Sequence, residues 1–183
     1  YGKVCALRGS PLAALVHYRE AMSMDTRKQA AEGVVRPYLE CALESLEHMG
    51  AYADVVAYCD RAIEHYGVHP PETALAQFDL ASIHQRRGVV LVKQGRRDEA
   101  AHALDVACAT ARNAQAALPL ADTLLRWLRA QLTISADRIA AEQARHRCCS
   151  VRSDTVRPER AVPLPGHFRV RPSMIVTREG SPH

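Results

Sequence analysis

The sequence predicts an all-α fold made of antiparallel helix pairs that stack into a right-handed superhelix with a concave surface. Glycines with matching neighbours recur at Gly9, Gly50 and Gly95, and apolar residues follow helical rather than alternating spacing. Aromatic residues are only 5% of a chain that is 48% hydrophobic and rich in alanine, which suits close helix–helix contact. A repeat interval of about 40 residues is typical of stacked helical arrays.

The neighbours of the three glycines define the expected pairs. A small or slender residue lies five positions after each glycine, a larger residue or a thiol nine after, and alanine twelve after. Glycine favours the left-handed turn that ends a helix, so each should join two helices that approach closely. The residues at seven before, four before, five after, nine after and twelve after are, in that order, Gly2, Cys5, Ala14, Tyr18 and Ala21 for Gly9; Leu43, Leu46, Val55, Cys59 and Ala62 for Gly50; and Gly88, Leu91, Ala100, Leu104 and Ala107 for Gly95.

The first two pairs are expected before residue 70. Gly2 falls inside a helix in this register, so we expect the chain to be a fragment whose first pair is cut, with its second helix at about 11–24. The second pair is predicted at 37–49 and 53–66. The segment 27–36 could extend the earlier helix through a kink near Gly33 and Pro37, and Gly67, Pro70 and Pro71 should end the later one.

The third pair is the clearest. Pro71 suits the first turn of a helix that carries Leu75, Phe78, Leu80, Ile83, Leu91 and Val92 and stops at Gly95. Its second helix starts near Asp98 and runs to about Asn113. An amphipathic helix at 119–132 and a helix capped by Ser135 and ending near His146 should follow. We therefore predict a helical array over 1–147 and a disordered basic tail over 148–183.

These positions resemble the tetratricopeptide repeat. The third unit matches best, and the second adds Tyr52 two residues after its turn glycine, as that family does. Pro11 and Arg87 depart from the family pattern. The repeat intervals of 41 and 45 residues exceed the usual ~34 and look like the longer repeats of bacterial signalling and transcription regulators. The stretch from Glu64 to Thr73 is weakly similar to a segment of bacterial transcriptional activator domains.

The resemblance implies a peptide-binding concave face formed by the first helix of each pair. Carried onto this chain, that face comprises Glu40, Glu44, Glu47, His48, Gln85, Val89, Val92 and Lys93. Its acidic side would take a protein or peptide of basic or mixed charge. The alternative is an ordinary solvated helix face, where charged stripes usually lie.

Charge and cysteine content narrow the classes of function. Residues 1–144 hold 16 Lys and Arg against 17 Asp and Glu, whereas residues 145–183 hold 8 against 3. The tail lacks a dense basic block, so we expect nucleic-acid binding only through a domain outside this sequence. Six cysteines without a disulfide or zinc-knuckle spacing favour a cytoplasmic location, and no apolar run reaches the ~18 residues of a membrane span.

No catalytic constellation is apparent. The sequence lacks a phosphate-binding glycine loop, an HExxH motif and a nucleophile elbow. His65 with His69, and His146 with Cys148 and Cys149, are weak metal candidates, and we expect no metal, cofactor or small-molecule substrate. The sequence thus predicts a non-catalytic protein-binding scaffold within a larger protein, with the sensor or effector region of a bacterial transcription regulator as the alternative.

Overall fold

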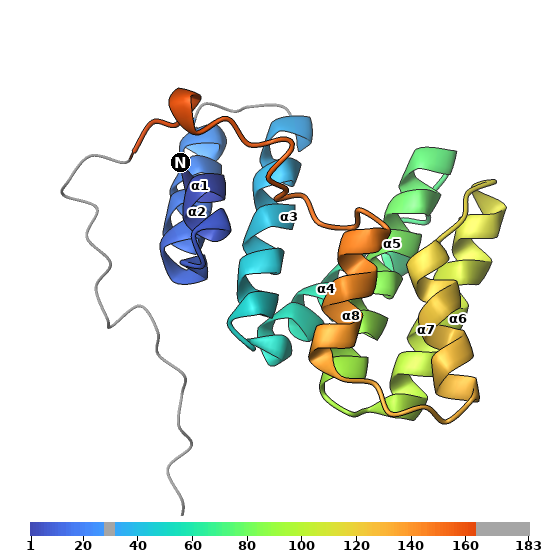
Figure 1. Ribbon diagram of the computed structural model, residues 1–183. Helices are drawn as coiled ribbons and strands as arrows, with labels where there is room; N and C mark the ends of the chain where they lie inside the picture. Colours follow the sequence, from blue (N-terminus) through green and yellow to red (C-terminus); the bar gives the residue numbers. More distant parts are fainter. Residues whose placement is uncertain (28–31, 164–183) are drawn as a thin grey trace, which may run out of the picture. The chain divides into compact units, whose positions relative to one another are not determined.

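The computed structural model describes residues 1–27 and 32–163, and every regular element within them is helical (Figure 1). The predicted all-α class is confirmed, whereas the stacking of pairs into a superhelix stays a prediction. The chain divides into two compact units, Tyr1–Ser45 with the segment from Val151 onward, and Leu46–Ser150. The elements are α1 (Gly2–Leu7), α2 (Pro11–Arg27), α3 (Glu32–His48), α4 (Tyr52–Val68), α5 (Ala74–Lys93), α6 (Arg97–Asn113), α7 (Pro119–Arg129), α8 (Ala136–Arg145) and the 3-10 turn η1 (Pro158–Arg160).

All three predicted glycine turns are left-handed. The φ angles of Gly9, Gly50 and Gly95 are 72°, 74° and 76°. In each turn the residue after the glycine donates its backbone N–H to the carbonyl four residues before the glycine, as Arg96 does to Leu91 at 3.0 Å. This bond satisfies a carbonyl that the helix end leaves open. The recurring glycines therefore mark helix ends because only glycine adopts this backbone conformation without strain.

Close helix approach is confirmed in two hairpins. A β-carbon built on Gly88 of α5 would lie 2.5 Å from Cγ of Leu104 and 3.4 Å from the carbonyl oxygen of Ala100, both in α6. A β-carbon on Gly2 would lie 2.6 Å from Cε1 of Tyr18. In both hairpins the residue nine after the turn thus fills the space left by the glycine seven before it.

The first unit has a small core in which Ala14, Tyr18, Cys41 and Ala42 are buried. Val151 packs against this cluster, and its backbone N–H donates to Oε2 of Glu44 at 3.2 Å. The stretch 148–163, which we predicted as part of the disordered tail, therefore has defined contacts and includes η1. The remainder of the predicted tail, 164–183, lies outside the described residues.

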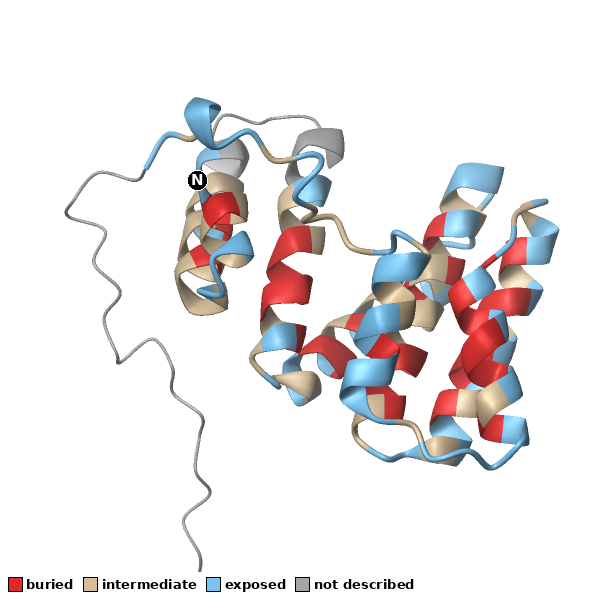
Figure 2. Ribbon diagram, in the orientation of Figure 1, coloured by how far each residue is buried: buried red, intermediate tan, exposed pale blue. Residues whose placement is uncertain are grey.

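The second unit buries the facing sides of α5, α6 and α7 (Figure 2). Leu91, Leu104, Leu120 and Leu124 are among its most deeply buried large side chains. The start of α5 departs from the apolar pattern expected of it, because Leu75 is 79% exposed and Phe78 is 37% exposed. Asp79 is buried instead, where the hydroxyl of Tyr66 in α4 donates to its Oδ2 at 2.7 Å.

Several helix ends differ from those predicted. α3 starts at Glu32 and contains Pro37, so the extension before Pro37 that the sequence allowed is present from Glu32 onward; residues 28–31 lie outside the described residues. α4 continues through Gly67 to Val68, and the prolines that follow end it. α5 starts at Ala74 rather than at Pro71, because the side chain of Thr73 accepts the N–H of Ala76 at 3.1 Å and caps the helix.

The later turns keep the left-handed geometry without glycine. Gln115, Gln131 and Arg147 have φ angles of 54°, 54° and 53°, and they follow α6, α7 and α8. The next residue again donates to a carbonyl four residues before the turn, as Leu132 does to Trp127 at 3.0 Å. The repeat of turns therefore extends beyond the last glycine mark at Gly95.

Candidate functional site

The candidate site is the face that α3 and α5 were expected to present to a partner. α3 carries Glu40, Glu44, Glu47 and His48, and α5 carries Gln85, Val89, Val92 and Lys93. A helix places residues four and seven apart on one side, which is why the sequence predicted a shared face. The structure shows which of these side chains are open to solvent.

The predicted residues of α3 differ in exposure. His48 is exposed and Glu40 is half-buried, whereas Glu44 and Glu47 are each only 6% exposed. Glu44 accepts the Val151 N–H within the first unit. Glu47 belongs to the second unit, where it has ionic partners of its own. Glu44 and Glu47 are therefore already engaged by the chain itself.

The predicted residues of α5 are mostly covered. Val89 and Val92 are buried at 2% and 6% exposure, and Gln85 is half-buried. The side chain of Lys93 is 9% exposed because it is held against Glu47. Little of this part of the face is therefore accessible to a partner.

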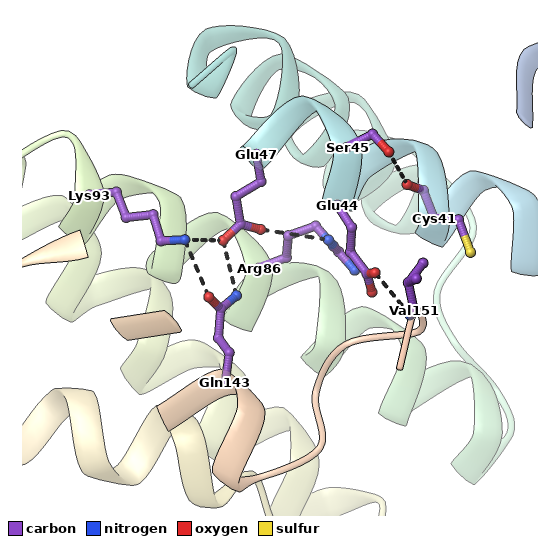
Figure 3. Close-up of polar contacts among 8 residues, drawn as sticks. All are labelled: Cys41, Glu44, Ser45, Glu47, Arg86, Lys93, Gln143 and Val151. Carbon is purple, nitrogen blue, oxygen red and sulfur yellow. Dashed lines mark hydrogen bonds and ion pairs between the residues drawn. The ribbon is translucent and has the colours of Figure 1, made fainter. Parts of the chain in front are cut away.

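Glu47 is the centre of a buried ionic cluster (Figure 3). Its Oε1 lies 2.5 Å from Nζ of Lys93, and its Oε2 lies 4.0 Å from Nη1 of Arg86. The Glu47 side chain is 5% exposed and that of Arg86 is 16% exposed. Two cations therefore face one carboxylate in an environment with little water, where charge interactions are stronger than at a surface.

Gln143 of α8 completes this cluster. Its Nε2 donates to Oε1 of Glu47 at 3.0 Å, and its Oε1 accepts from Nζ of Lys93 at 3.2 Å (Figure 3). The carboxamide of Gln143 thus donates to one member of the ion pair and accepts from the other. The predicted binding residues Glu47 and Lys93 are brought together by the fold, and a side chain of α8 lies on them.

α8 itself is a short, largely exposed helix. Ser135 caps it by accepting the N–H of Arg138 at 3.2 Å, as predicted. Ile139 is fully buried, and it is the one buried residue of α8. The guanidinium of Arg138 lies 4.0 Å from the ring centroid of Trp127 in α7, a cation–π contact. α8 also packs against α5.

The other candidate groups show little convergence. The rings of His65 and His69 stack with centroids 4.7 Å apart. Among the residues that the structure describes, three or more His, Cys, Asp or Glu side chains nowhere come together in a way that could hold a metal ion.

The described part of the chain contains no helix with both the length and the apolar character needed to cross a membrane.

Two buried cysteines have altered acidity. Burial raises the pKa of the Cys41 thiol to about 11. The pKa of Cys108 also rises to about 11, first through burial and then through the hydrogen bond from its thiol to Oδ1 of Asp122 at 3.4 Å. Both thiols are therefore protonated at neutral pH and behave as small apolar groups rather than nucleophiles.

Comparison with known proteins finds no matching family model, curated protein or solved structure. The interpretation of the site therefore depends on its geometry.

Sequence reasoning missed the residues that meet the predicted face from α8. Gln143 lies 96 positions after Glu47, and nothing in its local spacing indicates that the two side chains meet. It also missed Arg97, whose Nη1 donates to the carbonyl of Leu132 at 3.0 Å beyond the end of α7. The only sequence signal for the Gln143 contact was the predicted helix after Ser135.

Proposed function

We propose that this chain is a non-catalytic scaffold of the tetratricopeptide-repeat type that binds a protein or peptide on the face of α3 and α5. The observation that carries the proposal is the repeated hairpin: a left-handed glycine turn with a glycine seven before it packed on a large residue nine after it. Gly2 with Tyr18 and Gly88 with Leu104 have this relation. Such hairpins are typical of arrays whose exposed helix faces bind other chains.

The chemistry of the face favours a partner of mixed charge. Glu47 is already balanced by Lys93 and Arg86, so a purely basic segment would gain little there. Glu40 is half-buried and His48 is exposed, and they add a carboxylate and an imidazole on α3. A peptide with both charge signs and hydrogen-bonding side chains suits this set best.

A cytoplasmic location is part of the same proposal. Cys41, Cys59 and Cys108 are buried within helices. Thiols used in this way, as small apolar core residues, fit a reducing compartment.

The sensor or effector region of a bacterial transcription regulator remains the second candidate. The observation that favours it is helix length, since α4 and α6 each have 17 residues and α5 has 20. These lengths accompany the 41- and 45-residue intervals between turn glycines. A DNA-binding or nucleotide-binding motif encoded in the same reading frame would support this candidate.

Fluorescence anisotropy with labelled synthetic peptides tests the scaffold proposal. We would compare peptides of alternating Lys and Glu, of Lys with Gly, and of Glu with Gly against the full chain. The proposal predicts binding of the mixed peptide and about ten-fold weakening by Glu40→Lys, equivalent to about 1.4 kcal/mol. Glu99→Lys on α6 is the matched control, since Glu99 is exposed and lies on a different helix. Equal weakening by both changes, or preference for the acidic peptide, would count against the proposed face.

A further inference from the structure

We propose that α8 is an internal ligand, and that the surface beneath it binds an external amphipathic helix with an aliphatic residue followed four positions later by a carboxamide. This inference rests on the proposed function and names the partner's chemistry. All the residues that carry it belong to the second unit.

The polar half of the site is the pair formed by Glu47 and Lys93. It offers one strong acceptor and one strong donor to the same side chain, at 3.0 Å and 3.2 Å from the two amide heteroatoms of Gln143. A carboxamide has a donor and an acceptor side by side on one planar group. A carboxylate would lack the donor for Glu47, and an ammonium would lack the acceptor for Lys93.

The buried apolar residue of α8 is Ile139. Its exposure to solvent is 0%, although both of its chain neighbours are exposed. Residues four apart lie on the same side of a helix, so Ile139 and Gln143 point to the same surface. The buried aliphatic group supplies affinity and the carboxamide supplies orientation.

α8 is suited to being replaced. It has 10 residues, and an isolated helix of this length is marginal in water. Most of its side chains are exposed, and its Arg145 is 74% exposed. Segments with little buried apolar surface open at lower free energy than the core. Its charges are also mixed, with Asp137 and Glu142 against Arg138 and Arg145, in agreement with the partner class proposed above.

The test supplies α8 in trans. A fluorescein-labelled peptide of residues 135–147 is titrated against the wild-type full chain and against a full chain carrying Ile139→Asp and Gln143→Ala, whose own α8 cannot bind. Because the attached helix competes at an effective concentration near millimolar, we expect the variant to bind the peptide about 100-fold more tightly than wild type does. Ala140→Pro, at an exposed position, is a second way to release α8 if the first variant does not fold.

Peptide variants report the recognition chemistry. Gln143→Glu and Gln143→Lys peptides should each bind about ten-fold more weakly, because each lacks one of the two hydrogen bonds, whereas an Arg145→Ala peptide should bind unchanged. A folded, α8-released chain that does not bind the wild-type peptide would overturn the inference, as would equal affinity for the Gln143→Glu peptide.

These outcomes are separable from those of the scaffold proposal. Binding of the alternating Lys/Glu peptide without binding of the 135–147 peptide would overturn only the internal-ligand inference. Binding of the 135–147 peptide that depends on Gln143 would support the inference even if Glu40→Lys had no effect on the other peptides.

Discussion

Gly88 and Leu104 share one space across the hairpin of α5 and α6. A methyl group on Gly88 would lie 2.5 Å from Cγ and 2.7 Å from Cδ2 of Leu104, closer than unbonded carbons can approach. The contact joins the residue seven before Gly95 to the residue nine after it. The sequence predicted that these two helices approach closely, and the structure shows that Leu104 fills the space at Gly88.

Gly88→Ala should destabilise the chain, because Leu104 is fully buried and cannot move aside freely. We expect a loss of about 1–3 kcal/mol in the free energy of unfolding, the usual cost of an overpacked core. Urea denaturation followed by circular dichroism measures it. Gly67→Ala is the matched control: it is also helical but has no atom within 4 Å of the added carbon, so it should gain about 0.5–1 kcal/mol. Equal effects of the two changes would contradict the packing explanation.

Gln131→Gly should stabilise the turn after α7. Gln131 has a φ of 54°, a conformation that costs a non-glycine residue about 1–2 kcal/mol, partly offset by the greater chain entropy of glycine when unfolded. We expect a net gain of about 0.5–1 kcal/mol in the same denaturation experiment. Ala130→Gly, one residue earlier with a φ of −79°, should instead be destabilising. The opposite order would show that the left-handed turn carries no strain.

Lys93→Met should cost much more stability than a similar change at an exposed ion pair. It leaves the buried carboxylate of Glu47 with Arg86 at 4.0 Å and the Gln143 amide as its partners among the described residues. Removing one partner of a buried pair costs about 3–5 kcal/mol, whereas an exposed pair contributes about 0–1 kcal/mol. Arg129→Met, which breaks the exposed pair with Asp105, is the control. Similar losses for both variants, measured by chemical denaturation, would show that the cluster is not effectively buried.

Stability should fall as the pH rises from 9 to 11. The pKa of the Cys41 and Cys108 thiols is raised from 9.0 to about 11 in the folded chain, first by burial in each case. Between these values the unfolded chain loses thiol protons that the folded chain keeps, so alkaline pH favours unfolding. Below pH 9 both states are protonated and this contribution is constant.

The free energy of unfolding at several pH values measures this effect. A variant with Cys41→Ala and Cys108→Ala should show a shallower decline than wild type over that range. Because lysines and tyrosines also titrate there, the comparison is the difference between the two chains. Parallel pH profiles would contradict the thiol explanation.

Much of the fold follows from local sequence. Gly9, Gly50 and Gly95 mark turns because a left-handed residue at a helix end strongly favours glycine, and Ser135 marks a helix start because its hydroxyl can cap backbone N–H groups. Helix ends without such a signal were less predictable. Pro71 predicted a start for α5 three residues too early, and the side-chain cap of Thr73 sets the start at Ala74.

The candidate site was predictable only in part. Helical spacing places Glu40, Glu44 and Glu47 on one side of α3, and the same argument applies along α5. It does not show which carboxylates meet a partner within the chain. Glu44 is engaged by a backbone N–H 107 residues away, a contact that no spacing rule predicts.

The sequence by itself determined the helical class, the three glycine turns and the close approach of helices in the hairpins of Gly9 and Gly95, because each depends on residues within one turn or one hairpin. Only the tertiary structure decided that Leu75 is exposed, that Gln131 and Arg147 adopt glycine-like turns, and that Gln143 lies on Glu47 and Lys93. The physical reason is range. Backbone strain and capping act between neighbours, whereas burial and ion pairing depend on which distant segments the whole chain brings together.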